Sequence, residues 1–155
     1  MTVPAVGTSA PAFTLAGDTG PISLADFAGS KLVLYFYPKD DTPGCTTEGK
    51  DFSAHIREFA AADTHVVGVS RESAASKARF RAKHGLTVGL GADDDGAATE
   101  AYGVWVEKSM YGKKYMGIER STFLIGRDGR IARVWSKVKV PGHVADVLTA
   151  AQALA

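Results

Sequence analysis

The chain of 155 residues contains a single cysteine, Cys45, which follows the segment PKDDTPG. A thiolate is a nucleophile that can be oxidised reversibly, whereas the neutral thiol reacts slowly. Pro43 suits the first position of a helix and would place Cys45 in the first helical turn. Backbone N–H groups at that position lack intrahelical partners, and together with the helix dipole they favour an anion. The segment therefore predicts a stabilised thiolate, and the competing interpretation is a buried, inert cysteine.

The charges around Cys45 set a condition on this prediction. Asp40 and Asp41 precede it, and negative neighbours disfavour a thiolate. A helix end supplies roughly 0.3–2 kcal/mol, less than the ~2.7 kcal/mol that would ionise most of a free thiol at pH 7. A positive group is therefore required, and Arg120 is preferred because it directly precedes the apolar run STFLI, at a strand end. The other candidates are Lys39, Lys50, Arg71, Arg127, Arg130 and Arg133.

Three small or rigid residues complete the segment. Pro38 ends the preceding apolar run, because proline has no backbone N–H to donate to a neighbouring strand. Thr42 either caps the helix or contacts a substrate oxygen. Gly44 removes side-chain bulk beside the sulfur, and we expect this to let a small substrate approach.

Alternating strands and helices are expected to position these residues. Continuous apolar runs at 31–37 and 64–70 predict strands buried on both faces. Apolar residues at helical spacing predict a helix from about residue 43 to residue 62, and Ser73 and Gly85 predict the cap and the stop of another. Further along, the patterns predict a short helix at 96–102, a hairpin at 121–137 around Arg127-Asp128-Gly129, and an amphipathic helix at the C-terminus.

The order of these elements indicates the fold class. Strands separated by helices pair in parallel through crossovers, and the hairpin adds antiparallel strands. We therefore expect residues 1–155 to form a single three-layer α/β/α domain with a central mixed sheet. Residues 109–117 are expected to form an exposed loop near the site, residues 91–96 a solvated turn, and Trp105 and Trp135 to pack in the core.

Composition argues against several functions. The charged residues nearly balance, with 18 basic and 17 acidic side chains and no block of like charge, so neither a nucleic-acid nor a membrane role is indicated. One cysteine cannot form an internal disulfide, and the N-terminus lacks the pattern of a signal peptide, so we expect a cytoplasmic protein. The histidines lack metal-ligand spacing, and we expect no metal and no cofactor; they are His55, His65, His84 and His143.

The segment PKDDTPGC, residues 38–45, matches the P-x-x-x-T-x-x-C signature of peroxiredoxins. The segments GIERSTFLIGRDGRI, residues 117–131, and VWSKVKVPGHVADVL, residues 134–148, are similar to the bacterioferritin comigratory protein branch, also called peroxiredoxin Q. The resemblance covers essentially the whole chain. It implies a thioredoxin-like fold, reduction of hydrogen peroxide or organic hydroperoxides, and a role in antioxidant defence.

The resemblance also implies a role for each site residue. Cys45 would attack the peroxide and become a sulfenic acid. Thr42 would form a hydrogen bond with the reacting oxygens, and Arg120 would stabilise the thiolate and the charge that develops on the leaving oxygen. Pro38 would shield the sulfenate from water and over-oxidation, and Glu48 would orient Arg120.

The chain departs from many relatives because it lacks a resolving cysteine. Relatives carry this cysteine at one of two positions. At the first position this chain has Lys50, and at the second it has Arg81 or its neighbour Phe80. It therefore resembles a one-cysteine peroxiredoxin that an external thiol recycles, and thioredoxin, glutaredoxin with glutathione, another small thiol or a second chain remain open. We expect a monomer or weak homodimer. The alternatives to an enzyme are a redox sensor that relays oxidation by mixed disulfide and, with less support, a holdase-like binding protein.

Overall fold

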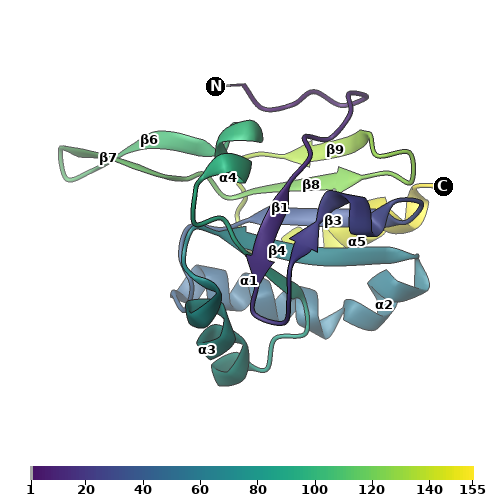
Figure 1. Ribbon diagram of the computed structural model, residues 1–155, viewed down its shortest axis with the longest axis horizontal. Helices are drawn as coiled ribbons and strands as arrows, with labels where there is room; N and C mark the ends of the chain where they lie inside the picture. The colour runs from purple at the N-terminus through teal and green to yellow at the C-terminus, as the bar shows by residue number, and fades with distance from the viewer. Residues whose placement is uncertain (1) are drawn as a thin grey trace.

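The computed structural model describes residues 2–155 and centres on a seven-stranded mixed sheet (Figure 1). The spatial order of the strands is β2-β1-β5-β4-β3-β8-β9. β4 pairs in parallel with both β3 and β5, whereas β8 is antiparallel to β3 and β1 is antiparallel to β5. The strands are β1 (Thr14–Gly17), β2 (Ile22–Ser23), β3 (Lys31–Phe36), β4 (Thr64–Ser70), β5 (Gly89–Ala92), β8 (Ser121–Ile125) and β9 (Ile131–Trp135).

β3 lies inside the sheet, and each of its residues is buried. Successive side chains of a strand point to opposite faces. Val33 and Tyr35 accordingly pack in one hydrophobic cluster, and Leu34 and Phe36 pack in the other. The prediction of a strand buried on both faces is confirmed, and the end of β3 leads directly into Pro38 and the cysteine segment.

Helices and loops cover the two faces of the sheet (Figure 1). One cluster contains Phe52, Phe59 and Phe80 from three helices, together with apolar residues of the C-terminal helix. The opposite cluster contains Phe13 and Tyr102. The three-layer arrangement is thus confirmed: α1 (Pro43–Ala54), α2 (Ile56–Ala61), α3 (Ala74–His84) and α5 (His143–Ala153) lie on one side, and the 3-10 helix η1 (Leu24–Phe27) and α4 (Ala97–Ala101) lie on the other. Among the described residues, no helix has the length and hydropathy to cross a membrane.

The boundaries of α3 agree with its predicted signals. The side chain of Ser73 accepts a hydrogen bond from the Ser76 backbone N–H at 3.1 Å. Gly85 ends the helix in the left-handed conformation with φ 64°, which glycine adopts without a Cβ clash. The helix matters for the site because it contacts the segment before Cys45.

The helix expected over residues 43–62 is instead two helices. His55 interrupts the helical backbone with φ −105° and ψ 12°, ending α1 and preceding α2. The apolar spacing does not reveal this break, because Phe52 and Phe59 on either side of it pack in the same cluster.

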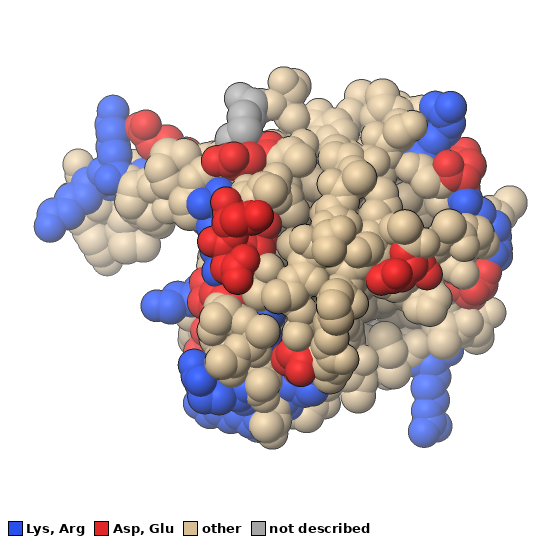
Figure 2. All heavy atoms as spheres, viewed as in Figure 1, with Lys and Arg blue, Asp and Glu red and all other residues tan. Residues whose placement is uncertain are grey.

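Residues 109–116 are exposed, as expected for the segment 109–117, but the segment is part of a two-stranded hairpin that projects from the body rather than a loop (Figure 1). It consists of β6 (Trp105–Met110) and β7 (Lys113–Ile118). Tyr111 and Gly112 connect them with φ of 51° and 78°, the positive values that two-residue hairpin turns require. Lysine or arginine side chains occupy the end of this projection (Figure 2).

The turn expected over residues 91–96 is only partly solvated. Asp93 is 1% exposed and accepts hydrogen bonds from the backbone N–H groups of Ala98 and Thr99 at the start of α4. The preceding β5 was not predicted because Gly89 and Gly91 interrupt its apolar pattern. The expected packing of Trp105 and Trp135 is confirmed, since each contacts a core cluster.

Candidate active site

Cys45 is the third residue of α1, and it is 2% exposed. Thr42 precedes the helix with extended backbone geometry, and Pro43 begins it. The N–H groups of the first helical turn have no intrahelical acceptor, so the sulfur lies in a locally positive backbone environment. The predicted position of the cysteine at a helix start is confirmed.

Arg120 reaches the cysteine because of the sheet topology. In the antiparallel pairing of β3 and β8, Phe36 lies opposite Ser121, so the beginning of β8 meets the end of β3. Arg120 immediately precedes β8, and its Nη2 donates to Cys45 Sγ at 3.4 Å. The guanidinium is therefore the positive group that was expected beside Cys45.

The other cationic candidates lie elsewhere. Lys39 and Lys50 are exposed. The four remaining arginines have partners of their own: Arg71 stacks on Trp105, Arg127 pairs with Asp63, Arg130 donates to Gly7 O, and Arg133 pairs with Asp146.

Glu48 lies one turn beyond Cys45 and is fully buried. Its Oε1 accepts a hydrogen bond from Arg120 Nη1 at 2.7 Å, while its Oε2 has no hydrogen-bond partner among the described residues. Burial raises the pKa of Glu48 to about 7, against the opposing effect of Arg120. Burial lowers the pKa of Arg120. The negative charges of Glu48 and Cys45 and their hydrogen bonds raise it by more, so the net effect is a raised pKa of the guanidinium. One arginine thus bridges the sulfur and a buried carboxyl group.

The raised pKa of Glu48 predicts a specific pH dependence of stability. Between its ordinary pKa of 4.5 and its folded value of about 7, the folded chain retains a proton that the unfolded chain has released. The unfolding free energy therefore falls as pH rises through this window, by up to about 3 kcal/mol. Glu48→Gln should remove this component, which urea denaturation of both proteins from pH 4 to 8 will measure. If the unfolding free energies of the wild type and the variant change with pH in parallel, Glu48 does not titrate between pH 4 and 8.

The two aspartates before the cysteine are paired with cations. Lys77 Nζ lies 3.3 Å from both carboxylate oxygens of Asp40. Asp41 contacts Lys83 at 2.8 Å and His84 at 2.7 Å, and these hydrogen bonds lower its pKa. Each of the two carboxylates therefore has a cationic side chain beside it.

Lys77 was missed in the sequence, although its spacing carried a signal. It is fully buried, and it also donates to Ser70 Oγ at 2.6 Å. It precedes Phe80 by three residues, which places both on the buried face of α3. Burial lowers the pKa of Lys77, and Asp40 is the main group that opposes this effect. The pair anchors the segment before Cys45 to α3.

Removing one member of this buried pair should destabilise the chain strongly. We expect Lys77→Met to reduce the unfolding free energy by about 3–5 kcal/mol, because Asp40 is left buried without its cation. Lys83→Met, on the exposed side of the same helix, is the matched control and should cost less than about 1 kcal/mol. Urea denaturation measures both. Combining Lys77→Met with Asp40→Asn should recover part of the loss, and equal losses in the two single lysine variants would contradict the assignment.

The contacts of Gly44 and Thr42 differ from those expected from the sequence. A Cβ at position 44 would lie 3.2 Å from Arg120 Nη2, so the glycine makes room for the guanidinium rather than only for a substrate. The Thr42 hydroxyl donates to Lys39 O at 2.8 Å and does not cap the helix. Its oxygen keeps lone pairs that can accept a hydrogen bond.

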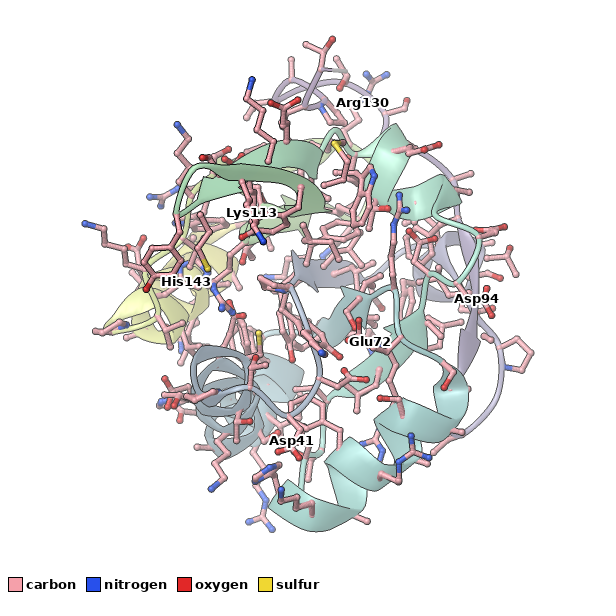
Figure 3. All side chains as sticks on the ribbon, turned by 90° about the vertical axis from the view of Figure 1, so that its left-hand side faces the viewer. Asp41, Glu72, Asp94, Lys113, Arg130 and His143 are labelled. Atoms are coloured by element: carbon pink, nitrogen blue, oxygen red, sulfur yellow. The ribbon has the colours of Figure 1, made fainter. Side chains whose placement is uncertain are left out.

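His143 lies near this site but is held by structural contacts. Its Nε2 lies 2.8 Å from Thr122 Oγ1, and burial is the main cause that lowers its pKa to about 4. The ring is therefore neutral at pH 7. Figure 3 shows where His143, Asp41 and Lys113 of the hairpin lie among the other side chains. Residues 2–155 contain no group of three or more metal-ligating side chains.

The sequence profile of the AhpC/TSA family matches residues 6–134. Peroxiredoxin Bcp of Bacillus subtilis is 49% identical over 144 residues, which is 92% of each chain. Among solved structures, a mutant of Xylella fastidiosa PrxQ superposes with a TM-score of 0.92 at 40% identity, covering 99% of this chain and 98% of the other.

A second solved structure bears on the chemistry. It belongs to a study of the alkyl peroxide reduction activity of Xanthomonas campestris bacterioferritin comigratory protein, with a trapped intermediate and ligand complexes. It superposes with a TM-score of 0.87 at 48% identity and covers 91% of this chain and 90% of the other. These similarities confirm the expected thioredoxin-like fold.

Proposed function

This chain belongs to the AhpC/TSA family, in its Bcp or peroxiredoxin Q branch, and from that premise we propose how its residues carry out the reaction. It is an enzyme, a thiol-dependent peroxidase that acts on peroxides. The assignment of residues rests chiefly on one observation: the guanidinium of Arg120 contacts both Cys45 Sγ and the buried carboxyl group of Glu48.

In the first step, the Cys45 thiolate attacks the terminal oxygen of the hydroperoxide. A sulfur–oxygen bond forms as the oxygen–oxygen bond breaks, which leaves a sulfenic acid and an alkoxide or hydroxide. The leaving oxygen then takes a proton to become an alcohol or water. Sulfur is oxidised and the peroxide is reduced by two electrons.

Arg120, Thr42 and Pro38 assist this step. Arg120 stabilises the thiolate and the negative charge that develops on the leaving oxygen, and Glu48 fixes the orientation of the guanidinium. The Thr42 hydroxyl donates to Lys39 O, so its oxygen can accept the hydrogen bond of the incoming hydroperoxide. Pro38, half-buried two residues after β3, limits access of water to the sulfenic acid.

An external thiol completes the cycle, because Cys45 is the only cysteine of the chain. The thiol displaces the sulfenic hydroxyl as water and forms a mixed disulfide with Cys45. A second thiol then releases Cys45 and leaves as the oxidised disulfide. We propose that thioredoxin, or glutaredoxin with glutathione, supplies these thiols in the cytoplasm, and that the chain acts as a monomer or weak homodimer.

Steady-state turnover tests this proposal. The purified chain with excess hydroperoxide and dithiothreitol should consume many equivalents of peroxide per chain. Thioredoxin, glutaredoxin with glutathione, and glutathione alone are then supplied separately, each with its own reductase. With thioredoxin, glutaredoxin or glutathione as the only reductant, a redox sensor would consume about one equivalent of peroxide and stop, and that result would refute catalysis.

A further inference from the structure

Two acidic groups share one guanidinium at the active site. Arg120 Nη2 donates to Cys45 Sγ at 3.4 Å, and Arg120 Nη1 donates to Glu48 Oε1 at 2.7 Å. If both acids are ionised, two negative charges face one positive charge and a net negative charge remains. If one of the two acids keeps its proton, the site as a whole is neutral.

The burial of these three side chains makes a net charge unfavourable. Cys45 and Glu48 are buried, and the side chain of Arg120 is largely buried. A buried charge without a partner has lost its hydration and gains no attraction in return. The surroundings therefore favour the state in which Cys45 and Glu48 together hold one proton, and the two acids titrate as a pair.

The second carboxyl oxygen of Glu48 is the position for that proton. Oε1 accepts the hydrogen bond from Arg120, whereas Oε2 is buried and has no hydrogen-bond partner among the described residues. An ionised carboxylate would place part of its charge on this unpartnered oxygen. The protonated group is neutral and leaves the charge of Arg120 to the sulfur. Burial, which raises the pKa of Glu48 to about 7, acts in the same direction.

The other titratable groups nearby do not replace Arg120 as the partner of Glu48, which forms no further ion pair within residues 2–155. Asp51, on the same helix, adds a negative charge that also raises the pKa of Glu48. Burial and then the charge of Glu48 raise the pKa of Tyr35 on β3, so its hydroxyl group stays neutral. His143 on α5 is neutral at pH 7, and the charge of half-buried Lys108 on β6 acts on the guanidinium.

We propose that Cys45 and Glu48 share a single proton across Arg120, and that the oxidation state of the sulfur decides whether Glu48 holds it. In the reduced enzyme the sulfur is a thiolate and Glu48 Oε2 carries the proton. In the oxidised enzyme the sulfenic acid is neutral, and Glu48 is ionised and pairs with Arg120. This inference rests on the proposed peroxidase cycle and specifies the source of the proton that its first step consumes. Glu48 acts through Arg120 and is thus a positioning residue.

Atoms and charges balance in both half-reactions. In the first, the thiolate takes the terminal O–H of the hydroperoxide, the oxygen–oxygen bond breaks, and the leaving oxygen takes up the proton that Glu48 gives up. Sulfur is oxidised and the peroxide is reduced, and the site is neutral before and after the step. In the second, two thiols become a disulfide, one water leaves, and the thiolate of Cys45 and the proton of Glu48 are restored.

Counting protons during a single oxidation tests the proposal. The reduced enzyme is mixed in a stopped-flow instrument with one equivalent of hydrogen peroxide, in a weakly buffered solution that contains a pH indicator, at pH 6 and at pH 8.5. The ultraviolet absorbance of the thiolate is measured before mixing and shows whether the sulfur is ionised. A thiolate that reacts without a proton from the protein leaves a hydroxide ion, which the indicator reports as uptake of one proton from the solution.

The wild type is expected to contain the thiolate at pH 6 and yet to take up less than about 0.2 proton per chain, because Glu48 supplies the proton. At pH 8.5, where Glu48 is already ionised, uptake should rise to about one proton. In Glu48→Gln the amide oxygen can still accept from Arg120, but no acidic proton is present, so uptake should be about one proton at both pH values. Glu58→Gln, which removes an exposed carboxylate from α2, is the matched control and should behave as the wild type.

Three outcomes would overturn the proposal while leaving the peroxidase intact. Equal uptake at pH 6 in the wild type and in Glu48→Gln would show that Glu48 orients Arg120 without changing its protonation. A wild type without thiolate absorbance at pH 6 would place the shared proton on the sulfur. If Glu48→Gln does not fold, the wild type decides alone, and equal uptake at pH 6 and pH 8.5 contradicts the proposal. A chain that consumes no peroxide would refute the proposed peroxidase chemistry itself, which is distinguishable because no oxidation then takes place.

Discussion

Cys45→Ser is expected to abolish peroxide turnover, with a loss of at least about a thousandfold. A serine hydroxyl is not ionised in this environment and cannot form the sulfenic acid that the cycle requires. The chain has no second thiol that could take over. Peroxide consumption in the presence of dithiothreitol measures the loss.

The variant should retain its fold, because the hydroxyl group is smaller than the thiol and the start of α1 is unchanged. Thermal unfolding followed by circular dichroism provides this control. Turnover by a folded Cys45→Ser protein at a rate near that of the wild type would place the reaction at another residue.

Arg120→Ala is expected to slow the attack on peroxide by about 10²–10³-fold. The substitution removes the donor that lies 3.4 Å from Cys45 Sγ. It therefore removes stabilisation of both the thiolate and the leaving oxygen. Stopped-flow measurement of the single-turnover oxidation step separates this effect from the later reaction with thiol.

Arg120→Ala also leaves both oxygens of Glu48 buried without a partner, so stability must be separated from catalysis. The double variant Arg120→Ala with Glu48→Gln removes the acid and should react as slowly as the single variant. Arg57→Ala, an exposed arginine on α2, should retain the wild-type rate. Full activity in folded Arg120→Ala would show that its assigned role is wrong.

The predictable parts of the site are those that local sequence determines. Pro43 and the apolar spacing after it indicate the start of α1, and the structure places Cys45 there. The position of Arg120 before a strand of an open sheet indicated that it could reach the site, and the β3–β8 pairing brings it to the sulfur.

The unpredicted parts depend on contacts between distant segments. Lys77 is separated from Asp40 by 37 positions, and no local pattern pairs them. A Cβ at position 44 would closely approach Arg120, and only the folded chain reveals this contact. The hairpin turn at Tyr111-Gly112 had a readable glycine signal, but the exposed, polar strands around it resembled a loop.

The most direct test of this account is the product of a single oxidation. One equivalent of hydrogen peroxide is added to the reduced enzyme at pH 7, dimedone is added at once, and the modified peptide is identified by mass spectrometry. The account predicts complete consumption of the peroxide and one dimedone adduct per chain, on Cys45. Peroxide left unconsumed, or oxidation found on methionine while Cys45 remains a free thiol, would contradict it.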